Sequence, residues 1–379
     1  MSGVMMMIIA IVVLGGAYLL YGRYLQNKWG IDPNAKTPAY EMEDGVDYVP
    51  ADTNVVFGHQ FASIAGAGPI NGPIQAAIFG WLPVLLWILI GGVFFGAVQD
   101  FASMYASVKN KGRTIGYIIE EYIGKLGKKL FLLFCWLFCI LVVAAFADVV
   151  AGTFKGFTVD EAGAVTKIAA NGAVATTSML FIIEAVALGY FLKYTKFNKW
   201  INTAVAILLL VAAIALGLNF PVYVDLGTWH IIIFAYILVA SVAPVWALLQ
   251  PRDYLSSFLL YAMMVIAAVG VIGAGLTGAD AAHMDMPAFT GAYDTIAPTG
   301  TSLGYVFPAL FVTIACGAIS GFHSLVGSGT TAKQLDHERD AKPIAYGGML
   351  IECALALISL SAVSFIWNEY ASGEIVTPT

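Results

Sequence analysis

Residues 58 to 73 read Gly58-His59-Gln60-Phe61-Ala62-Ser63-Ile64-Ala65-Gly66-Ala67-Gly68-Pro69-Ile70-Asn71-Gly72-Pro73, within an apolar stretch long enough to cross a membrane. The last eight hold three glycines and two prolines. Each proline removes a backbone donor, and each glycine weakens a helix by about 1 kcal/mol relative to alanine. In hydrocarbon a broken helix persists only inside protein or beside a water-filled cavity. The stretch therefore predicts a broken transmembrane helix lining a binding site; the alternative is a kinked helix whose small residues permit close packing.

The composition of the whole chain is that of a membrane protein. Of its 379 residues, 60% are hydrophobic and 11% are charged, less than half of the roughly 25% charge found in soluble domains. A net charge of −6, with acidic residues gathered between Glu41 and Asp52, offers no basic surface for nucleic acid. The four cysteines lie in apolar runs away from histidines, so we expect no disulfide and no metal site.

Sequence motifs of soluble enzymes are absent from the chain. It has no Walker A loop, no H-E-x-x-H, no nucleophile elbow and no dinucleotide fingerprint between a strand and a helix. We therefore expect neither an enzyme nor an ATP-driven pump, and no cofactor. A membrane enzyme is the weakest of the alternatives, because no acid-base cluster appears at usable spacing.

Apolar runs of about 20 residues, the length needed to cross a bilayer, predict an all-α polytopic protein with one transmembrane domain over residues 1–379. The first run lacks a preceding basic stretch and a cleavage site, so we expect a retained helix rather than a signal peptide. The ten expected spans are 4–22, 55–79, 81–107, 130–154, 175–192, 200–219, 229–249, 254–277, 304–322 and 344–367.

The distribution of basic residues orients these spans. With ten spans, 16 of the 18 Lys and Arg fall in loops on one side, and only Lys155 and Lys167 fall on the other. Because basic loops stay in the cytoplasm, we expect an extracellular N-terminus and a multi-pass protein of the cell membrane.

The second half of the chain repeats the pattern of spans seen in the first half. Ala240-Ser241-Val242-Ala243-Pro244-Val245-Trp246 interrupts the seventh span as the Gly/Pro-rich segment interrupts the second. Five spans from 55 to 219 are followed by four from 229 to 367, and an odd number of spans inverts the second set. This is the inverted-repeat plan of many secondary transporters, whose sites form at paired broken helices. We expect 4–22 to be an extra N-terminal helix and the second repeat to be truncated.

Several sequence blocks, together covering about residues 5 to 367, resemble the carbon starvation protein A family of bacterial and archaeal membrane transporters. Besides the segment from Gly58 to Ile70, the blocks are Trp81-Leu82-Pro83, Gly96-Ala97-Val98-Gln99-Asp100-Phe101, Leu249-Gln250-Pro251-Arg252-Asp253-Tyr254-Leu255-Ser256, Ile314-Ala315-Cys316-Gly317-Ala318-Ile319-Ser320-Gly321-Phe322-His323-Ser324 and Ser328-Gly329-Thr330-Thr331-Ala332-Lys333-Gln334-Leu335. The resemblance implies secondary uptake of peptides, or of pyruvate in some branches, during nutrient limitation. It also implies a fold like that of the leucine transporter. Family members generally continue beyond the point where this chain stops.

We expect the unwound segment from Ala65 to Asn71 to face the interruption at Ser241 to Pro244 across a central cavity. Free N–H groups at the start of the Pro73 half-helix would hold a carboxylate, which peptides and pyruvate share. The expected substrate-binding residues are Ser63, Gly66, Gly68, Asn71 and Ser241. H⁺ or Na⁺ would drive uptake, with a cation site formed by Ala65, Thr313 and Ser320; the hydroxyls could instead bond to their own helix.

Ionisable residues in apolar spans are candidates for a proton relay or a gate, because membrane-buried charge usually marks a pathway. Here they are His59, Asp148, Glu184 and His323. Each also has a structural interpretation, such as placement at a helix end or, for His323, an ordinary packed histidine. For Gln99 and Asp100, near the expected cytoplasmic end of the third span, a helix cap is the favoured interpretation.

Two other functions use the same features. A membrane-embedded nutrient sensor would bind peptides or pyruvate without translocation, whereas a channel would need a continuous polar pore that the sparse polar residues do not suggest. The oligomeric state is not indicated by the sequence.

Overall fold

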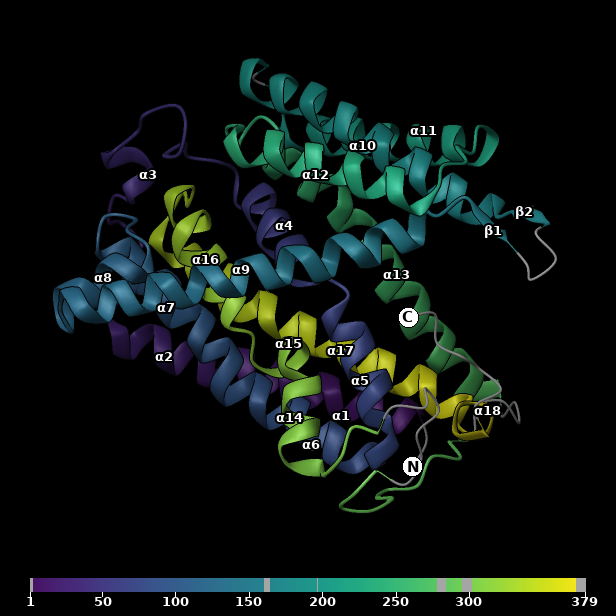
Figure 1. Ribbon diagram of the computed structural model, residues 1–379. Helices are drawn as coiled ribbons and strands as arrows, with labels where there is room; N and C mark the ends of the chain where they lie inside the picture. Colours follow the sequence, from purple (N-terminus) through teal and green to yellow (C-terminus); the bar gives the residue numbers. More distant parts are fainter. Residues whose placement is uncertain (1–2, 160–163, 196, 278–283, 295–301, 373–379) are drawn as a thin grey trace. The chain divides into compact units, whose positions relative to one another are not determined.

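The computed structural model describes residues 3–159, 164–195, 197–277, 284–294 and 302–372, almost entirely as helices (Figure 1). A single two-stranded antiparallel sheet pairs β1 (Phe157–Val159) with β2 (Val165–Lys167) in the described part of the chain. The predicted all-α class is therefore confirmed. Residues 373–379, at the end of the sequence, lie outside the described residues.

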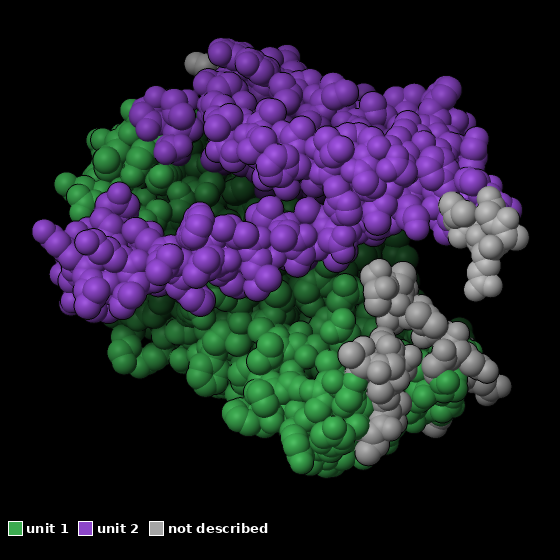
Figure 2. All heavy atoms as spheres, in the orientation of Figure 1, with its two compact units in different colours: residues 1–43, 48–115, 259–379 green, residues 44–47, 116–258 purple. Residues whose placement is uncertain are grey.

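The chain divides into two compact units, coloured in Figure 2. Unit 1 comprises residues 1–43, 48–115 and 259–379, and unit 2 comprises 44–47 and 116–258. The helices of unit 1 are α1 (Gly3–Gly16), η1 (Ala17–Tyr21), α2 (Gly22–Trp29), α3 (Pro38–Glu41), α4 (Thr53–Ile64), α5 (Gly68–Ala76), η2 (Ala77–Phe79), α6 (Trp81–Gly91), η3 (Gly92–Gly96), α7 (Ala97–Lys109), α14 (Val306–Thr313), α15 (Ala315–Ala318), α16 (Gly321–Gly329), η5 (Thr331–Lys333), η6 (Glu338–Asp340), η7 (Lys342–Gly347), α17 (Gly348–Phe365) and α18 (Trp367–Ser372). Those of unit 2 are α8 (Ile115–Tyr122), α9 (Lys125–Phe154), α10 (Ala169–Tyr194), α11 (Lys199–Asn219) and α12 (Leu226–Val242), and α13 (Leu249–Thr277) connects the two units in the chain.

Seven helical stretches of the described chain are long and apolar enough to cross a membrane: Gly3–Trp29, Trp81–Lys109, Lys125–Phe154, Ala169–Tyr194, Trp200–Asn219, Leu249–Thr277 and Glu338–Phe365. Each overlaps one of the spans expected from the sequence. Leu226–Val242 is a shorter apolar helix, and the expected spans at 55–79 and 304–322 are broken into pieces. The protein is an integral membrane protein of the polytopic, all-α class.

The predicted break in the second span is confirmed. Helix α4 begins where the Asp52 carboxylate caps it by accepting the N–H of Asn54 at 2.9 Å. It ends at Ile64, and Ala65 leaves the helical conformation. Helix α5 resumes at Gly68 and continues through Pro73, so the second half-helix begins five residues earlier than the sequence suggested.

A further break lies in the stretch that the sequence predicted as one span, 304–322. The backbone departs from the helix at Ile314, and Ile319 and Ser320 are extended. This produces the three pieces α14, α15 and α16 (Figure 1). Unit 1 thus contains two discontinuous helices, α4–α5 and α14–α16.

Three π-helical turns meet around one aromatic side chain in unit 1. The turns are η1, η3 and η7, each inserted within a longer helix. Tyr346 of η7 is fully buried, with its ring centroid 6.5 Å from that of Tyr21. Its hydroxyl donates to the carbonyl of Val93 in η3 at 3.5 Å. Single π turns inside α-helices are frequent at functional sites.

A polar network joins the loop that contains α3 to the segment before η6. Thr37 Oγ1 donates to the carbonyl of Leu335 at 2.6 Å, and the Tyr40 hydroxyl donates to Asp336 Oδ1 at 2.5 Å. Thr53 Oγ1 donates to Asp340 Oδ2 at 2.9 Å. These bonds join the α3 region and the start of α4 to residues 335–340, which follow α16 in the chain.

We expect the Tyr40 phenol to lose its proton at a higher pH than an ordinary tyrosine. Its hydrogen bond to Asp336, followed by partial burial, raises the pKa of the phenol to about 12. Because an ordinary tyrosine has a pKa of about 10, the stability that this bond contributes is present below about pH 10 and is lost as pH rises toward 12. The phenolate absorbance of the wild type minus that of Tyr40→Phe should show a midpoint of about 12. A titration midpoint of about 10, the ordinary tyrosine value, would contradict the hydrogen bond between Tyr40 and Asp336.

Candidate functional site

The two discontinuous helices of unit 1 cross through glycines. A Cβ added at Gly68 in α5 would lie 2.5 Å from Cys316 Cβ, and one added at Gly72 would lie 2.5 Å from the carbonyl oxygen of Thr313. On the other side of α15, a Cβ at Gly317 would lie 2.9 Å from Ala356 Cβ of α17. Real Cβ atoms essentially never approach below 3.0 Å, so only glycine allows the broken segments to touch.

Three ionisable side chains from three helices meet next to this crossing. His323, in the first turn of α16, places Nδ1 2.9 Å from Asp100 Oδ2 of α7. Its Nε2 lies 3.3 Å from Glu352 Oε2 of α17. The three side chains are at most 1% exposed. We name Asp100, His323 and Glu352 the acid–imidazole–acid trio.

The charges of the trio do not balance when all three groups are ionised. One imidazolium can neutralise one carboxylate, so the second would remain as an uncompensated charge in the interior, which costs several kcal/mol. Asp100 Oδ1 and both carboxylate oxygens of Glu352 accept no hydrogen bond from the described residues. Adding one proton gives a net charge of zero, which suits a low-dielectric site.

Polar side chains connect the trio to the break after α15. Gln99 Nε2 donates to Ser324 Oγ at 2.9 Å and approaches the carbonyl oxygen of Ser320 at 3.4 Å. Ser103 Oγ donates to the carbonyl of Asp100 at 3.0 Å. The extended residue Ser320 is therefore tied to the helix that carries Asp100.

The sequence-based interpretation of Gln99 and Asp100 as a helix cap is wrong. Both residues lie inside the continuous helical stretch Trp81–Lys109, far from its end, and Asp100 is buried against His323. Glu352 is not among the residues predicted from the sequence, although a carboxylate between Ile351 and Cys353 in an apolar span is itself a signal of function.

The other residues predicted in unit 1 lie along its two broken helices. Ser63 lies in the last turn of α4, and Ala65 is buried at the break. Gly66 and Asn71 are exposed. Thr313 ends α14, and Ser320 is buried immediately before α16. His59 is buried in α4. Of the predicted proton-relay residues, His323 is the one that the described structure places between two carboxylates. The roles of all these residues stay predictions.

Two of the three predicted residues in unit 2 have local partners. Ser241 Oγ donates to the carbonyl of Leu238 in its own helix at 2.8 Å. Asp148 Oδ1 lies 3.0 Å from His230 Nε2, and both side chains are exposed. Glu184 is half-buried, and its Oε2 has no hydrogen-bond partner within the described ranges. That Ser241 to Pro244 faces the first broken helix stays a prediction.

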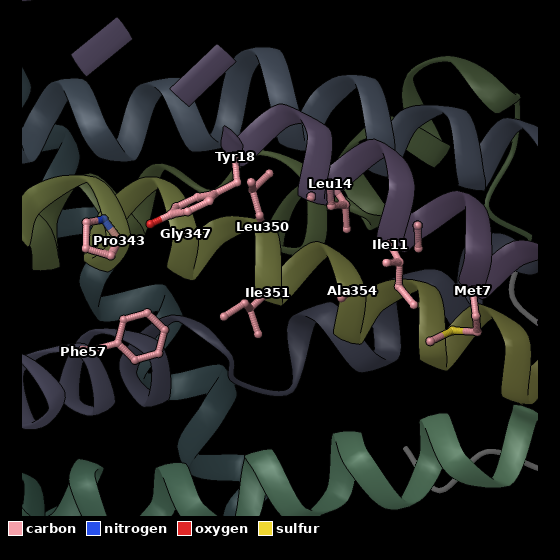
Figure 3. Close-up of a pocket in the computed structure, with 12 residues that line it drawn as sticks. Met7, Ile11, Leu14, Tyr18, Phe57, Pro343, Gly347, Leu350, Ile351 and Ala354 are labelled. Atoms are coloured by element: carbon pink, nitrogen blue, oxygen red, sulfur yellow. The ribbon is translucent and has the colours of Figure 1, made fainter. Parts of the chain in front are cut away.

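An apolar pocket of about 440 Å³ opens elsewhere in unit 1 (Figure 3). It lies among α1, η1, α4, η7 and α17, and the Tyr18 hydroxyl is the one polar side-chain group in its lining. A carboxylate buried there would lack the hydrogen bonds and counter-charge that it needs. The pocket suits hydrocarbon and does not suit a peptide terminus or pyruvate.

No arrangement of His, Cys, Asp and Glu that could hold a metal ion occurs within the described residues. In the trio, both imidazole nitrogens already face carboxylates, so no ring lone pair points toward a shared metal position.

Comparison with known proteins gives relatives over nearly the whole chain. The family model described as carbon starvation protein CstA matches residues 2–375. The chain is 38% identical to the peptide transporter CstA of Escherichia coli K12 over 92% of its own length and 48% of the relative's. It is 37% identical to the Bacillus subtilis peptide transporter CstA, covering 96% of this chain and 58% of that protein.

A relative with a different printed substrate matches equally well. The pyruvate/proton symporter BtsT of Escherichia coli K12 is 38% identical over 92% of this chain and 47% of that protein. No solved structure matches the chain. The chain spans about half the length of the curated relatives that it matches. On the family model and these identities, the chain belongs to the carbon starvation protein CstA family.

Proposed function

We propose that this chain is a secondary active transporter that imports peptides or a small carboxylate such as pyruvate during carbon starvation, coupled to H⁺ or Na⁺. The observation that carries the proposal is the glycine-mediated crossing of two discontinuous membrane helices, α4–α5 and α14–α16. Broken helices at membrane depth line cavities in transporters. Relatives named as a peptide transporter and a pyruvate/proton symporter support the same class.

The proposed substrate site is the break between α4 and α5. Backbone N–H groups at the start of α5, whose dipole is positive at that end, would hold the substrate carboxylate. Ser63, Gly66, Gly68 and Asn71 would surround it, with Ser241 completing the site from the second repeat. A cation, if Na⁺ drives uptake, would lie among Ala65, Thr313 and Ser320.

The architecture proposed with this function is a leucine-transporter-like inverted repeat. Residues 55–219 would form the first repeat, residues 229–367 the second, and residues 4–22 the extra N-terminal helix. Alternating access would then arise from one helix set rocking against the other around the site. The N-terminus would be extracellular in the cell membrane.

Counterflow in proteoliposomes tests the proposal. Vesicles loaded with unlabelled pyruvate or a dipeptide should take up the labelled compound transiently and saturably when they contain the purified chain. Imposing a proton gradient, with and without Na⁺, identifies the coupling ion by the gradient that drives accumulation. Ligand binding in detergent without any counterflow would favour a nutrient sensor, and flux without saturation would favour a channel.

A further inference from the structure

We propose that the acid–imidazole–acid trio of Asp100, His323 and Glu352 is the proton-binding site of this protein, loaded and emptied once in each transport cycle. The inference rests on the proposed function and assigns its coupling ion. It starts from geometry, because one imidazole lies between two carboxylates at 2.9 and 3.3 Å in a buried part of unit 1.

The arrangement selects a proton over a metal cation. A Na⁺ site needs several oxygen atoms converging on one point, whereas here the imidazole separates the two carboxylates. His323 is hydrogen-bonded to Asp100 and lies within ion-pair distance of Glu352, so a proton added to either acid stays within one cluster. The trio therefore has two charge states, −1 and 0, that differ by one H⁺.

Helices α4, α15 and α17, which pack against the trio, contain no lysine or arginine. Their titratable side chains near the trio are His59 of α4, Cys316 of α15 and Cys353 of α17.

The lysines on neighbouring segments are engaged elsewhere. Lys109 of α7 pairs with Glu338 at 2.7 Å. Lys342 of η7 lies over the Tyr18 ring, and Lys333 of η5 lies over the Tyr48 ring. Because no lysine is left for the second carboxylate among the described residues, a proton is the charge that neutralises it.

The trio is also placed to affect the backbone break. His323 belongs to the first turn of α16, three residues after the extended Ser320. Gln99, next to Asp100, donates to Ser324 and approaches the Ser320 carbonyl. A change in charge on Asp100 or Glu352 thus acts on the first turn of α16 and on Ser320, the extended residue before it. Proton binding on one side of the membrane and release on the other would accompany its movement.

Glu352→Gln tests the assignment, because glutamine keeps the shape of the side chain and cannot carry the proton. In proteoliposomes, accumulation driven by a proton gradient should fall by about tenfold or more, and substrate-driven H⁺ uptake, read with a trapped pH dye, should be lost. Counterflow, which needs no net proton movement, should persist. Glu338→Gln is the matched control, since it also neutralises a buried carboxylate of unit 1 but one paired with Lys109; it should keep substrate-driven H⁺ uptake.

Substrate-driven H⁺ uptake by Glu352→Gln equal to that of the wild type would overturn the proposal. A second measurement uses purified protein without any transport assay, so it still tests the proposal if a variant reconstitutes poorly into vesicles. The infrared difference spectrum of the purified wild type between acidic and alkaline pH should contain a protonated-carboxyl band that is missing or shifted in Glu352→Gln or in Asp100→Asn. A band identical in both variants would equally overturn the assignment. Absence of counterflow by the wild type would reject the proposed function, while the infrared result would still decide the trio.

Discussion

Gly68→Leu is expected to abolish uptake of labelled pyruvate and dipeptide while the protein still inserts into the membrane. The Cβ alone would lie 2.5 Å from Cys316 Cβ and 2.6 Å from its sulfur, so α5 and α15 would have to separate. Overpacking of this kind costs typically about 1–3 kcal/mol, and the leucine branches add to it. Uptake per correctly inserted molecule, measured in proteoliposomes, is the readout.

A matched control distinguishes this crossing from a general intolerance of glycine replacement. Gly16 at the end of α1 has nothing within 4 Å of an added Cβ, so Gly16→Leu should transport at the wild-type rate. Normal uptake by well-inserted Gly68→Leu would show that contact between the two broken helices is not needed for transport.

His323→Ala is expected to destabilise the protein more than any other single change within the trio. The imidazole is the common partner of Asp100 and Glu352, and its removal leaves two buried carboxylates without compensation. Breaking a buried ion pair by removing one partner typically costs about 3–5 kcal/mol. Thermal unfolding in detergent, compared with the wild type at the same pH, measures the loss.

Replacing all three side chains of the trio with uncharged ones should restore part of the stability lost in His323→Ala. In the combined variant Asp100→Asn, His323→Ala and Glu352→Gln no carboxylate remains to be ionised, so the buried-charge penalty disappears. We expect its unfolding temperature to lie above that of His323→Ala, although proton-driven uptake stays lost. If the combined variant unfolds at or below the temperature of the single variant, packing of the imidazole rather than its charge explains the effect.

The first break could be predicted from the sequence because its cause is local. Glycines and prolines between Gly66 and Pro73 weaken a continuous helix through this region, and the break falls at its start, between Ile64 and Gly68, although Gly68 to Pro73 themselves belong to α5. The second break could not, since Ile314 to Ser320 contains a single glycine and no proline. Its departure from helical geometry depends on the approach of α5 and α17 to α15, which is tertiary packing that no local pattern encodes.

The trio was only partly predictable for a similar reason. His323 is a candidate from the sequence as an ionisable side chain at the edge of an apolar span, and Asp100 is assigned to a helix end because the third expected span stops soon after it. The three residues come from α7, α16 and α17 and are buried against each other. This contact forms only when helices far apart in the sequence pack together. The available signal was an ionisable residue in an apolar span. For Glu352 this signal alone would have been enough to propose a functional role.

The π-helical turns carry a consequence for insertions and deletions. Each of η3 and η7 holds one more residue per turn than the α-helix around it, and they precede Asp100 and Glu352 respectively. Removing one residue from either turn would restore the α-helical hydrogen bonds and leave the rest of the helix close to its present rotation, because the wide turn already takes up the extra residue. Removing one residue from the α-helical part between a turn and its carboxylate would instead rotate the helix after the deletion by about 100° about its axis, and the carboxylate would leave the face that meets His323. The π turns are therefore the places where these two helices can lose a residue while keeping their buried faces.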